Sequence, residues 1–202
     1  MKFVFLTILL AVVLSLIWDI VLYEGNDKHI KTIFKDRKTI LLDIPNWIII
    51  GIFSYILPKD FYSIILLLII FILYEIILID IKEQLINIKL IIALSILAIV
   101  SLFINNGVTI LDSVITGLVL FILLYIVSKA TREALGKGDA IIFGILGFIF
   151  GYEGIISILI LSSAISFVIS MIYLIRGFRK KSIAFTPCIY IALLVLIFLN
   201  NY

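Results

Sequence analysis

The chain has 202 residues, of which 64% are hydrophobic and only 14% are charged. Soluble globular domains carry roughly 45–50% apolar residues, so this composition excludes a soluble globule and indicates an integral membrane protein. The single cysteine, Cys188, excludes an internal disulfide framework and a cysteine-based zinc site. The net charge of +3 gives no reason to expect a nucleic-acid partner, because the basic residues follow the membrane topology.

Long apolar runs predict helices rather than barrel strands, because a helix satisfies its backbone hydrogen bonds within one segment. At about 20 apolar residues per span, the chain has room for six to eight helices and no soluble domain. We predict one all-α transmembrane domain over 1–202, with about eight spans at 3–23, 40–57, 61–79, 90–104, 108–128, 140–151, 155–175 and 183–199. The ranges 140–151 and 155–175 can also form one long or broken helix across Tyr152-Glu153-Gly154.

The basic residues predict which side of the membrane each loop occupies. Lys and Arg occur five times in 24–39, twice in 80–89, three times in 129–138 and four times in 176–181. These alternate loops hold all but Lys2 and Lys59. The positive-inside rule therefore places the four loops in the cytoplasm and both termini outside.

Two aspartates lie where apolar segments meet these cytoplasmic loops. Asp80 follows the span 61–79, and Asp139 precedes the short span 140–151. An ionisable residue at the membrane boundary is costly unless it is used or paired, so both are candidate functional residues. Gly136 and Gly138 precede Asp139 closely and allow the backbone to approach another element or a substrate strand.

Paired carboxylates at one membrane face predict aspartyl protease chemistry. Two carboxyl groups that approach closely cannot both ionise, so they share one proton. The ionised group takes a proton from the attacking water, while the protonated group donates to the carbonyl oxygen and then to the leaving nitrogen. This chemistry requires neither a metal nor a bound cofactor, so we expect none.

Two sequence motifs resemble those of type IV prepilin peptidases and archaeal preflagellin peptidases. The first is Asp80-Ile81-Lys82-Glu83-Gln84-Leu85-Ile86-Asn87, and the second is Gly136-Lys137-Gly138-Asp139, which leads into an apolar helix with Gly147 and Gly151. Phe185-Thr186-Pro187 is similar to a proline-containing element of bacterial members. The resemblance covers about residues 61 to 199. It implies that Asp80 and Asp139 are the catalytic pair of a membrane aspartic endopeptidase of the G-x-G-D group.

The resemblance also implies which substrates are cleaved and that methyltransferase activity is missing. Its members remove a short basic leader from pilin-like or archaellin precursors, which carry class III signal peptides, at the cytoplasmic face of the plasma membrane. Bacterial members insert a zinc-binding, cysteine-rich segment after the first helix and also methylate the new amino terminus. This chain has only the short cytoplasmic loop 24–39 there, without cysteine, so we expect the archaeal form without methyltransferase activity.

Other polar residues leave alternatives open. Asp43-Ile44-Pro45-Asn46-Trp47 is a rival for the first aspartate motif, although its acid and proline also suit a helix start. Glu75 could tune Asp80, and Lys82 and Lys137 could contact substrate. A small transporter would use intramembrane acids such as Asp19, Asp43, Glu75 and Asp112. A non-enzymatic assembly subunit would explain the bundle but not the glycine-aspartate motif.

Overall fold

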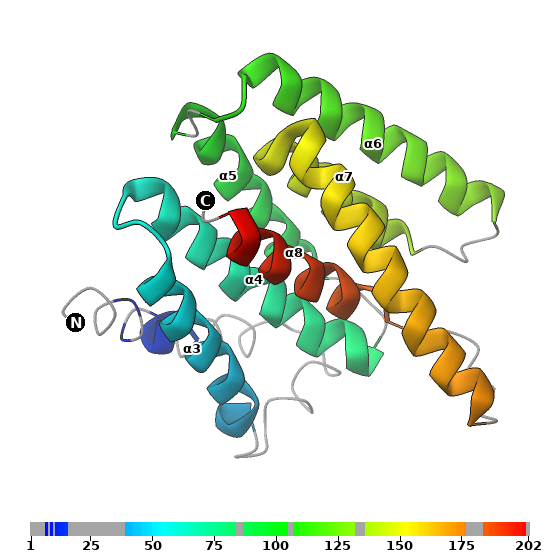
Figure 1. The fold of residues 1–202 in the computed structure, drawn as a ribbon, viewed down its shortest axis with the longest axis horizontal. Coiled ribbons are helices and arrows are strands. Elements are labelled where there is room, and N and C mark those ends of the chain that lie inside the picture. The colour runs from blue at the N-terminus through cyan, green and yellow to red at the C-terminus, as the bar shows by residue number, and fades with distance from the viewer. Residues whose placement is uncertain are drawn as a thin grey trace.

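A computed structural model describes residues 7, 9, 11–15, 39–83, 87–104, 107–131, 136–176 and 184–200. These residues form helices and short connections and contain no strand (Figure 1). The helices labelled in Figure 1 are α3 (Thr39–Ile56), α4 (Phe61–Glu83), α5 (Ile88–Ile104), α6 (Ile110–Ala130), α7 (Lys137–Ile175) and α8 (Thr186–Asn200). The predicted all-α fold is therefore confirmed for the part of the chain that is described.

Three of these helices are long and apolar enough to cross a membrane. They are α4 over Phe61–Ile81, α6 over its whole length, and α7. Three more apolar helices are shorter, at Asp43–Ile56, Ile88–Ile104 and Thr186–Leu199. The protein is thus a helical membrane protein, but the predicted count of about eight spans is not confirmed. Most of the predicted span 3–23, and nearly all of the loop 24–39, lie outside the described residues.

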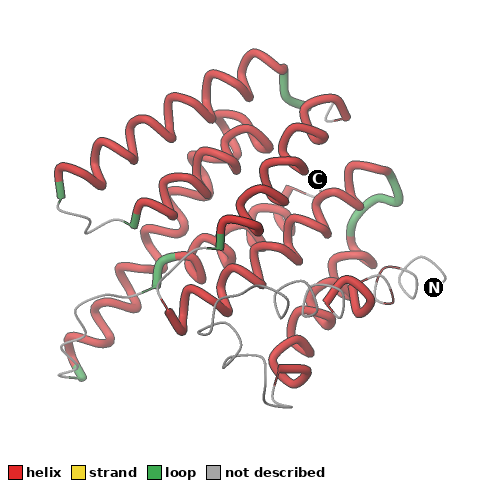
Figure 2. The backbone as a smooth tube through the Cα atoms, turned by 180° about the vertical axis from the view of Figure 1, so that it is seen from behind, coloured by secondary structure: helices red, strands yellow, loops and turns green. Residues whose placement is uncertain are grey.

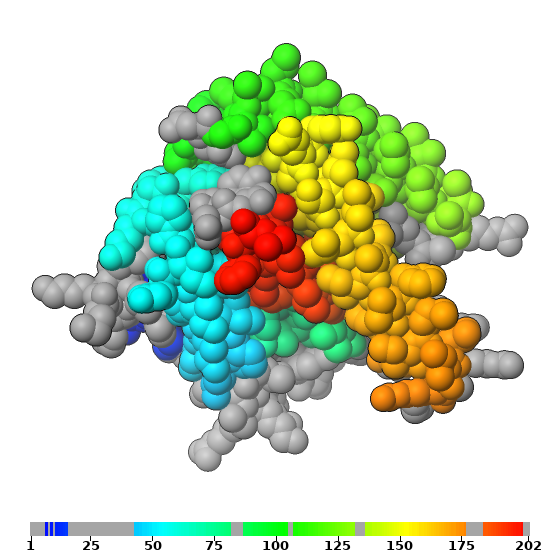
Figure 3. All heavy atoms as spheres, in the orientation of Figure 1, coloured from blue at the N-terminus to red at the C-terminus, as the bar shows by residue number. Residues whose placement is uncertain are grey.

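The helices pack around α4 and α8 in a way that brings distant parts of the chain together. On the face shown in Figure 3, α8 lies between α3 and α7, and α8 contacts both α7 and α4. Helix α5 likewise contacts both α4 and α7, while α6 packs mainly against α7. The ends of α4, α6 and α7 gather at one end of the bundle together with the starts of α5, α7 and α8 (Figure 2).

Helix α7 is broken at Gly151, where the backbone adopts φ 61° and ψ −168°. This left-handed φ is accessible to glycine at low cost. The sequence left 140–151 and 155–175 open as separate or joined spans, with the junction at 152–154. The structure has one element from Lys137 to Ile175 with a break at Gly151, just before the expected junction.

Asp112 of α6 closes the break in α7. Its Oδ2 atom accepts a hydrogen bond from the backbone N–H of Tyr152 at 3.2 Å, and its Oδ1 atom accepts one from the Thr116 hydroxyl at 3.2 Å. The second part of α7 begins at this point and therefore has free backbone N–H groups, which a carboxylate satisfies as a helix cap does. Asp112 thus has a structural role that its sequence context did not reveal.

Glycines bring the first part of α7 close to α6. A Cβ atom on Gly147 would lie 3.0 Å from the Gly117 Cα atom, and one on Gly144 would lie 2.8 Å from the Phe121 Cβ atom. A Cβ on Gly117 would collide with the ring of Phe148. Small residues at such an interface allow two membrane helices to approach closely, which is the main source of their packing energy.

We predict that Gly151→Ala destabilises the protein by about 1–3 kcal/mol, because the left-handed φ is strained for alanine. The added Cβ would also lie 2.5 Å from both Asp112 Oδ2 and Val108 Cγ1. The measurement is the free energy of unfolding in detergent. Ser157→Ala is the control, since Ser157 is exposed on the second part of α7. Equal stability of Gly151→Ala and wild type would contradict this account of the break.

Candidate active site

Asp139 lies in the first turn of α7 and is held there by local contacts. The predicted span began at 140, whereas α7 begins at Lys137 with Gly136 as its N-cap. The Gly136 backbone hydrogen-bonds to the Asp139 carboxylate, which resembles a capping box, where the third helical residue reaches back to the N-cap amide. The free amides and the helix dipole at this end favour a carboxylate.

Gly136 is required for close approach rather than for an unusual backbone angle. Its φ is −59°, which any residue can adopt. However, a Cβ atom at this position would lie 2.9 Å from Asp139 Oδ2. A larger side chain would therefore displace the carboxylate. Gly138 lies inside the first turn of α7 and is partly exposed.

Thr186 of α8 provides a second contact to Asp139. Its hydroxyl donates to Asp139 Oδ1 at 3.3 Å, and the Thr186 side chain is fully buried. The adjacent Phe185 packs on Phe143, with ring centroids 5.9 Å apart. Phe185-Thr186-Pro187 is similar to a proline-containing element of bacterial members, but that likeness predicted no role for Thr186. This element was the sequence feature from which the role of Thr186 could have been predicted.

Asp80 lies inside the last turn of α4 rather than after the helix. The predicted span ended at 79, but α4 continues to Glu83, and the Asp80 side chain is only 8% exposed. Its Oδ2 atom is buried and has no hydrogen-bond partner among the described residues. Its charge acts on the carboxyl group of Asp139. The bundle therefore brings together the two aspartates that the sequence singled out.

The helices that carry the two aspartates, α4 and α7, are held together by other helices that pack against both. Both α8 and α5 contact α4 and α7. Asp80 and Asp139 are thus two buried acids, 59 positions apart in the chain, at the end of the bundle where α4 ends and α7 begins (Figure 1). Such a pair can share a proton and act as a general acid and a general base.

The remaining predicted residues lie in different surroundings. Lys137 is exposed at the start of α7, and the side chain of Lys82 lies outside the described part of the chain. Glu75 is buried in α4, and its charge acts on Tyr74. The rival aspartate, Asp43, is buried in α3, and its charge also acts on Tyr74.

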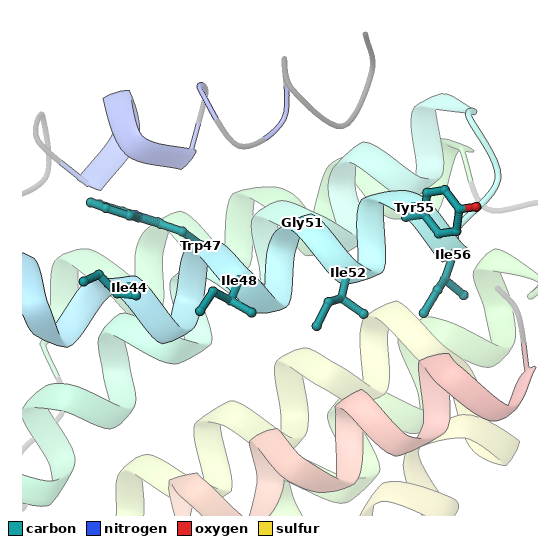
Figure 4. A pocket seen from close by; sticks show the side chains of 7 residues that line it. All are labelled: Ile44, Trp47, Ile48, Gly51, Ile52, Tyr55 and Ile56. Atoms are coloured by element: carbon teal, nitrogen blue, oxygen red, sulfur yellow. The ribbon is translucent and has the colours of Figure 1, made fainter. Parts of the chain in front are cut away.

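An apolar groove of about 550 Å³ runs along α3 and does not include either aspartate. Ile44, Ile48, Ile52 and Ile56 follow one side of the helix (Figure 4). Their spacing of four residues places them on one helix face. Trp47, Gly51 and Tyr55 complete the lining.

These features define a helical membrane protein in which two buried carboxyl groups on separate helices lie within range of each other's charge. Residues 64–175 match the model of the type IV leader peptidase family. The matched range is more than half of the chain and contains Asp80 and Asp139 but not Asp43. The chain belongs to the type IV leader peptidase family and is therefore a peptidase. It matched no curated protein and no solved structure.

We predict that Thr186→Val destabilises the protein by about 1–3 kcal/mol, because a buried carboxylate oxygen loses its hydrogen-bond donor. Valine has nearly the shape of threonine, so packing is preserved. Thr186→Ser keeps the hydroxyl and should stay closer to wild type. The measurement is the free energy of unfolding of all three proteins. If the valine variant proved at least as stable as the serine variant, the hydrogen bond to Asp139 would not stabilise the fold.

Proposed function

We propose that this protein is a membrane aspartic endopeptidase in which Asp80 and Asp139 form the catalytic pair. The observation that carries the proposal is the burial of both carboxyl groups within range of each other's charge. Their location within the region that matches leader peptidases supports it. The rival Asp43 lies outside that region.

The contacts of each aspartate suggest how the pair works. Asp139 lies at the amino end of a helix and accepts hydrogen bonds from Gly136 and Thr186. Burial and the charge of Asp80 oppose the ionised form of Asp139, and these donors offset part of that cost. On the strength of the donors and the helix N-terminus we assign Asp139 as the general base that takes a proton from water. Asp80 lies at the carboxyl end of α4, where the helix dipole disfavours negative charge. It is therefore the general acid that protonates the carbonyl oxygen and then the leaving nitrogen.

The proposed substrates are pilin-like or archaellin precursors with a class III signal peptide, which is a short basic leader followed by a hydrophobic helix. The hydrophobic helix remains in the bilayer beside the bundle, and the leader junction extends into the space at the two aspartates. The positive-inside rule, applied to the basic loops, supports a cytoplasmic location for this end of the bundle. The protein would then be a multi-pass plasma-membrane protein with both termini outside.

We also propose that the protein cleaves without methylating its product. The loop 24–39 is short and contains no cysteine. It therefore cannot supply the cysteine-rich zinc segment that the bacterial, methylating relatives carry at this position. This proposal concerns a second activity and is independent of the assignment of the aspartate pair.

Asp80→Asn and Asp139→Asn should each abolish leader cleavage, because a proton-sharing pair cannot work with one carboxyl group and losses within a catalytic unit are not additive. The assay is cleavage of a panel of leader-bearing precursors in membranes. Asp43→Asn is the matched control, since Asp43 is also a buried acid of the bundle, and it should retain activity. Loss in Asp43→Asn with retention in Asp80→Asn would move the first catalytic aspartate to α3.

Cysteine labelling should place 24–39, 80–89, 129–138 and 176–181 on the cytoplasmic side. Cys188 is the only native cysteine and is buried, so Cys188→Ala gives a background for single cysteines in each loop. An impermeant thiol reagent applied to intact cells should miss all four loops and reach a cysteine at Lys59. Labelling of 80–89 and 129–138 from opposite sides would be incompatible with a single catalytic pair.

A further inference from the structure

A second group of buried polar residues lies in the bundle, apart from the aspartate pair. Its members are Asp43 and Asn46 of α3, Tyr74 and Glu75 of α4, and Tyr190 of α8. Except for Tyr74, which is partly buried, each has an exposed fraction of 6% or less. The proposed cleavage reaction uses none of them.

Tyr74 connects the three helices of this polar cluster. Its ring meets the ring of Tyr190 edge to face, with centroids 5.9 Å apart, and the charges of Asp43 and Glu75 both act on it. Asn46 lies three residues after Asp43, which places the two on the same face of α3. Since both are buried and α3 packs on α4, that face points into the bundle.

Two members of the polar cluster have polar atoms without a partner in the described structure. The Asn46 side chain is fully buried, and neither its amide oxygen nor its amide nitrogen is hydrogen-bonded within the described residues. The Tyr190 hydroxyl is also buried and unpartnered there. Leaving a buried polar group without a hydrogen bond destabilises the folded state, so partners beyond these side chains are expected.

We propose that the polar cluster of Asp43, Asn46, Tyr74, Glu75 and Tyr190 is an internal water-binding site. Buried waters typically make about three hydrogen bonds to polar groups that lack other partners. An amide with two donor and two acceptor positions, together with phenol and carboxyl groups, matches water, which both donates and accepts. Among the described residues, no group of three or more His, Cys, Asp or Glu side chains could hold a metal ion instead.

A further buried polar atom lies on α3, in the residue next to Asn46. Trp47 follows Asn46 in α3 and lines the apolar groove on that helix (Figure 4). Its indole nitrogen is likewise buried without a hydrogen-bond partner in the described residues.

The water site lies near the aspartate pair but is separate from it. Glu75 precedes Asp80 by five residues, about 7.5 Å along the helix axis at 1.5 Å per residue. Tyr190 follows Thr186 by four residues and therefore lies one turn further along the same face of α8. The proposal goes beyond the cleavage reaction and holds or fails independently of it.

The Tyr190→Phe substitution tests the site, because the direction in which the midpoint of thermal unfolding changes distinguishes a water-bound hydroxyl from an unsatisfied one. If the hydroxyl has no partner, Tyr190→Phe removes an unsatisfied group and raises the midpoint of thermal unfolding. If it binds water, the same change removes a hydrogen bond and lowers the midpoint. We expect a lower midpoint. An unchanged or higher midpoint would overturn the proposal for this residue.

Asn46→Leu tests the amide with nearly the same side-chain volume, and a lower unfolding midpoint is again expected. Ser54→Ala is the matched control on the same helix. Ser54 is fully buried, but its hydroxyl already donates to the Gly51 carbonyl at 3.1 Å, so its loss should not affect the polar cluster.

Hydroxyl-radical labelling by X-ray pulses detects the water directly, because bound water generates radicals beside buried side chains. Tyr190 should be oxidised several times faster than Phe150, an aromatic residue that is 1% exposed in the apolar core. Asn46→Leu should reduce the Tyr190 rate severalfold, and Ser54→Ala should leave it unchanged. Oxidation of Tyr190 at the Phe150 rate in the wild type would show a dry cluster and refute the water site.

Discussion

The constraint on which this structure depends is the cost of placing carboxylates in an apolar bundle. Some carboxylates of the described structure lie at helix N-termini, whose free amides and dipole stabilise negative charge. Asp60 accepts the Ser63 backbone N–H at 2.9 Å at the start of α4. Asp112 accepts from the segment of α7 that begins after the break. Asp139 occupies the first turn of α7.

Asp80 lies outside this pattern, as do the buried acids Asp43 and Glu75 within α3 and α4. Asp80 is buried near the carboxyl end of α4, where the dipole opposes a negative charge, and one of its oxygens has no hydrogen-bond partner in the described residues. The nearby charge of Asp139 adds to the cost if both groups ionise. Where a residue breaks the rule that its neighbours obey without a compensating contact, function is the usual reason. The buried oxygen without a partner and the nearby charge of Asp139 make Asp80 a candidate functional residue.

Much of the fold could be predicted because each helix can be recognised from its own segment of the sequence. The apolar runs from 40 onward lie within a few residues of the observed helices, since long hydrophobic segments interrupted by charged loops leave few other possibilities. The ends of α4 and α7 were misplaced by a few residues around Asp80 and Asp139. The polar residues at these two positions predict loops from the sequence. In the structure the helical backbone continues through them, because Asp80 and Asp139 are buried against neighbouring helices.

What could not be predicted depends on contacts between helices. The break at Gly151 is stabilised by Asp112, which lies on α6 and is 39 residues distant in the chain. The contact between Thr186 and Asp139 likewise joins α8 to α7. Neither pairing leaves a periodic signal in the sequence, because each is set by how the helices pack. Both aspartates could still be chosen from local motifs, whereas the residues that hold them in place could not.

Different faces of helix α7 pack against α6 and carry the Asp139 carboxyl group. Gly144, Gly147 and Gly151 recur at helical spacing and meet α6, so this face lets the two backbones approach. Asp139 and Phe143, one turn apart, instead contact Thr186 of α8 and Phe185, which precedes that helix. Close packing on α6 fixes the helix on one side and leaves the other to present the carboxyl group. The glycines therefore contribute to the site without touching it, because they hold the helix on which Asp139 is mounted.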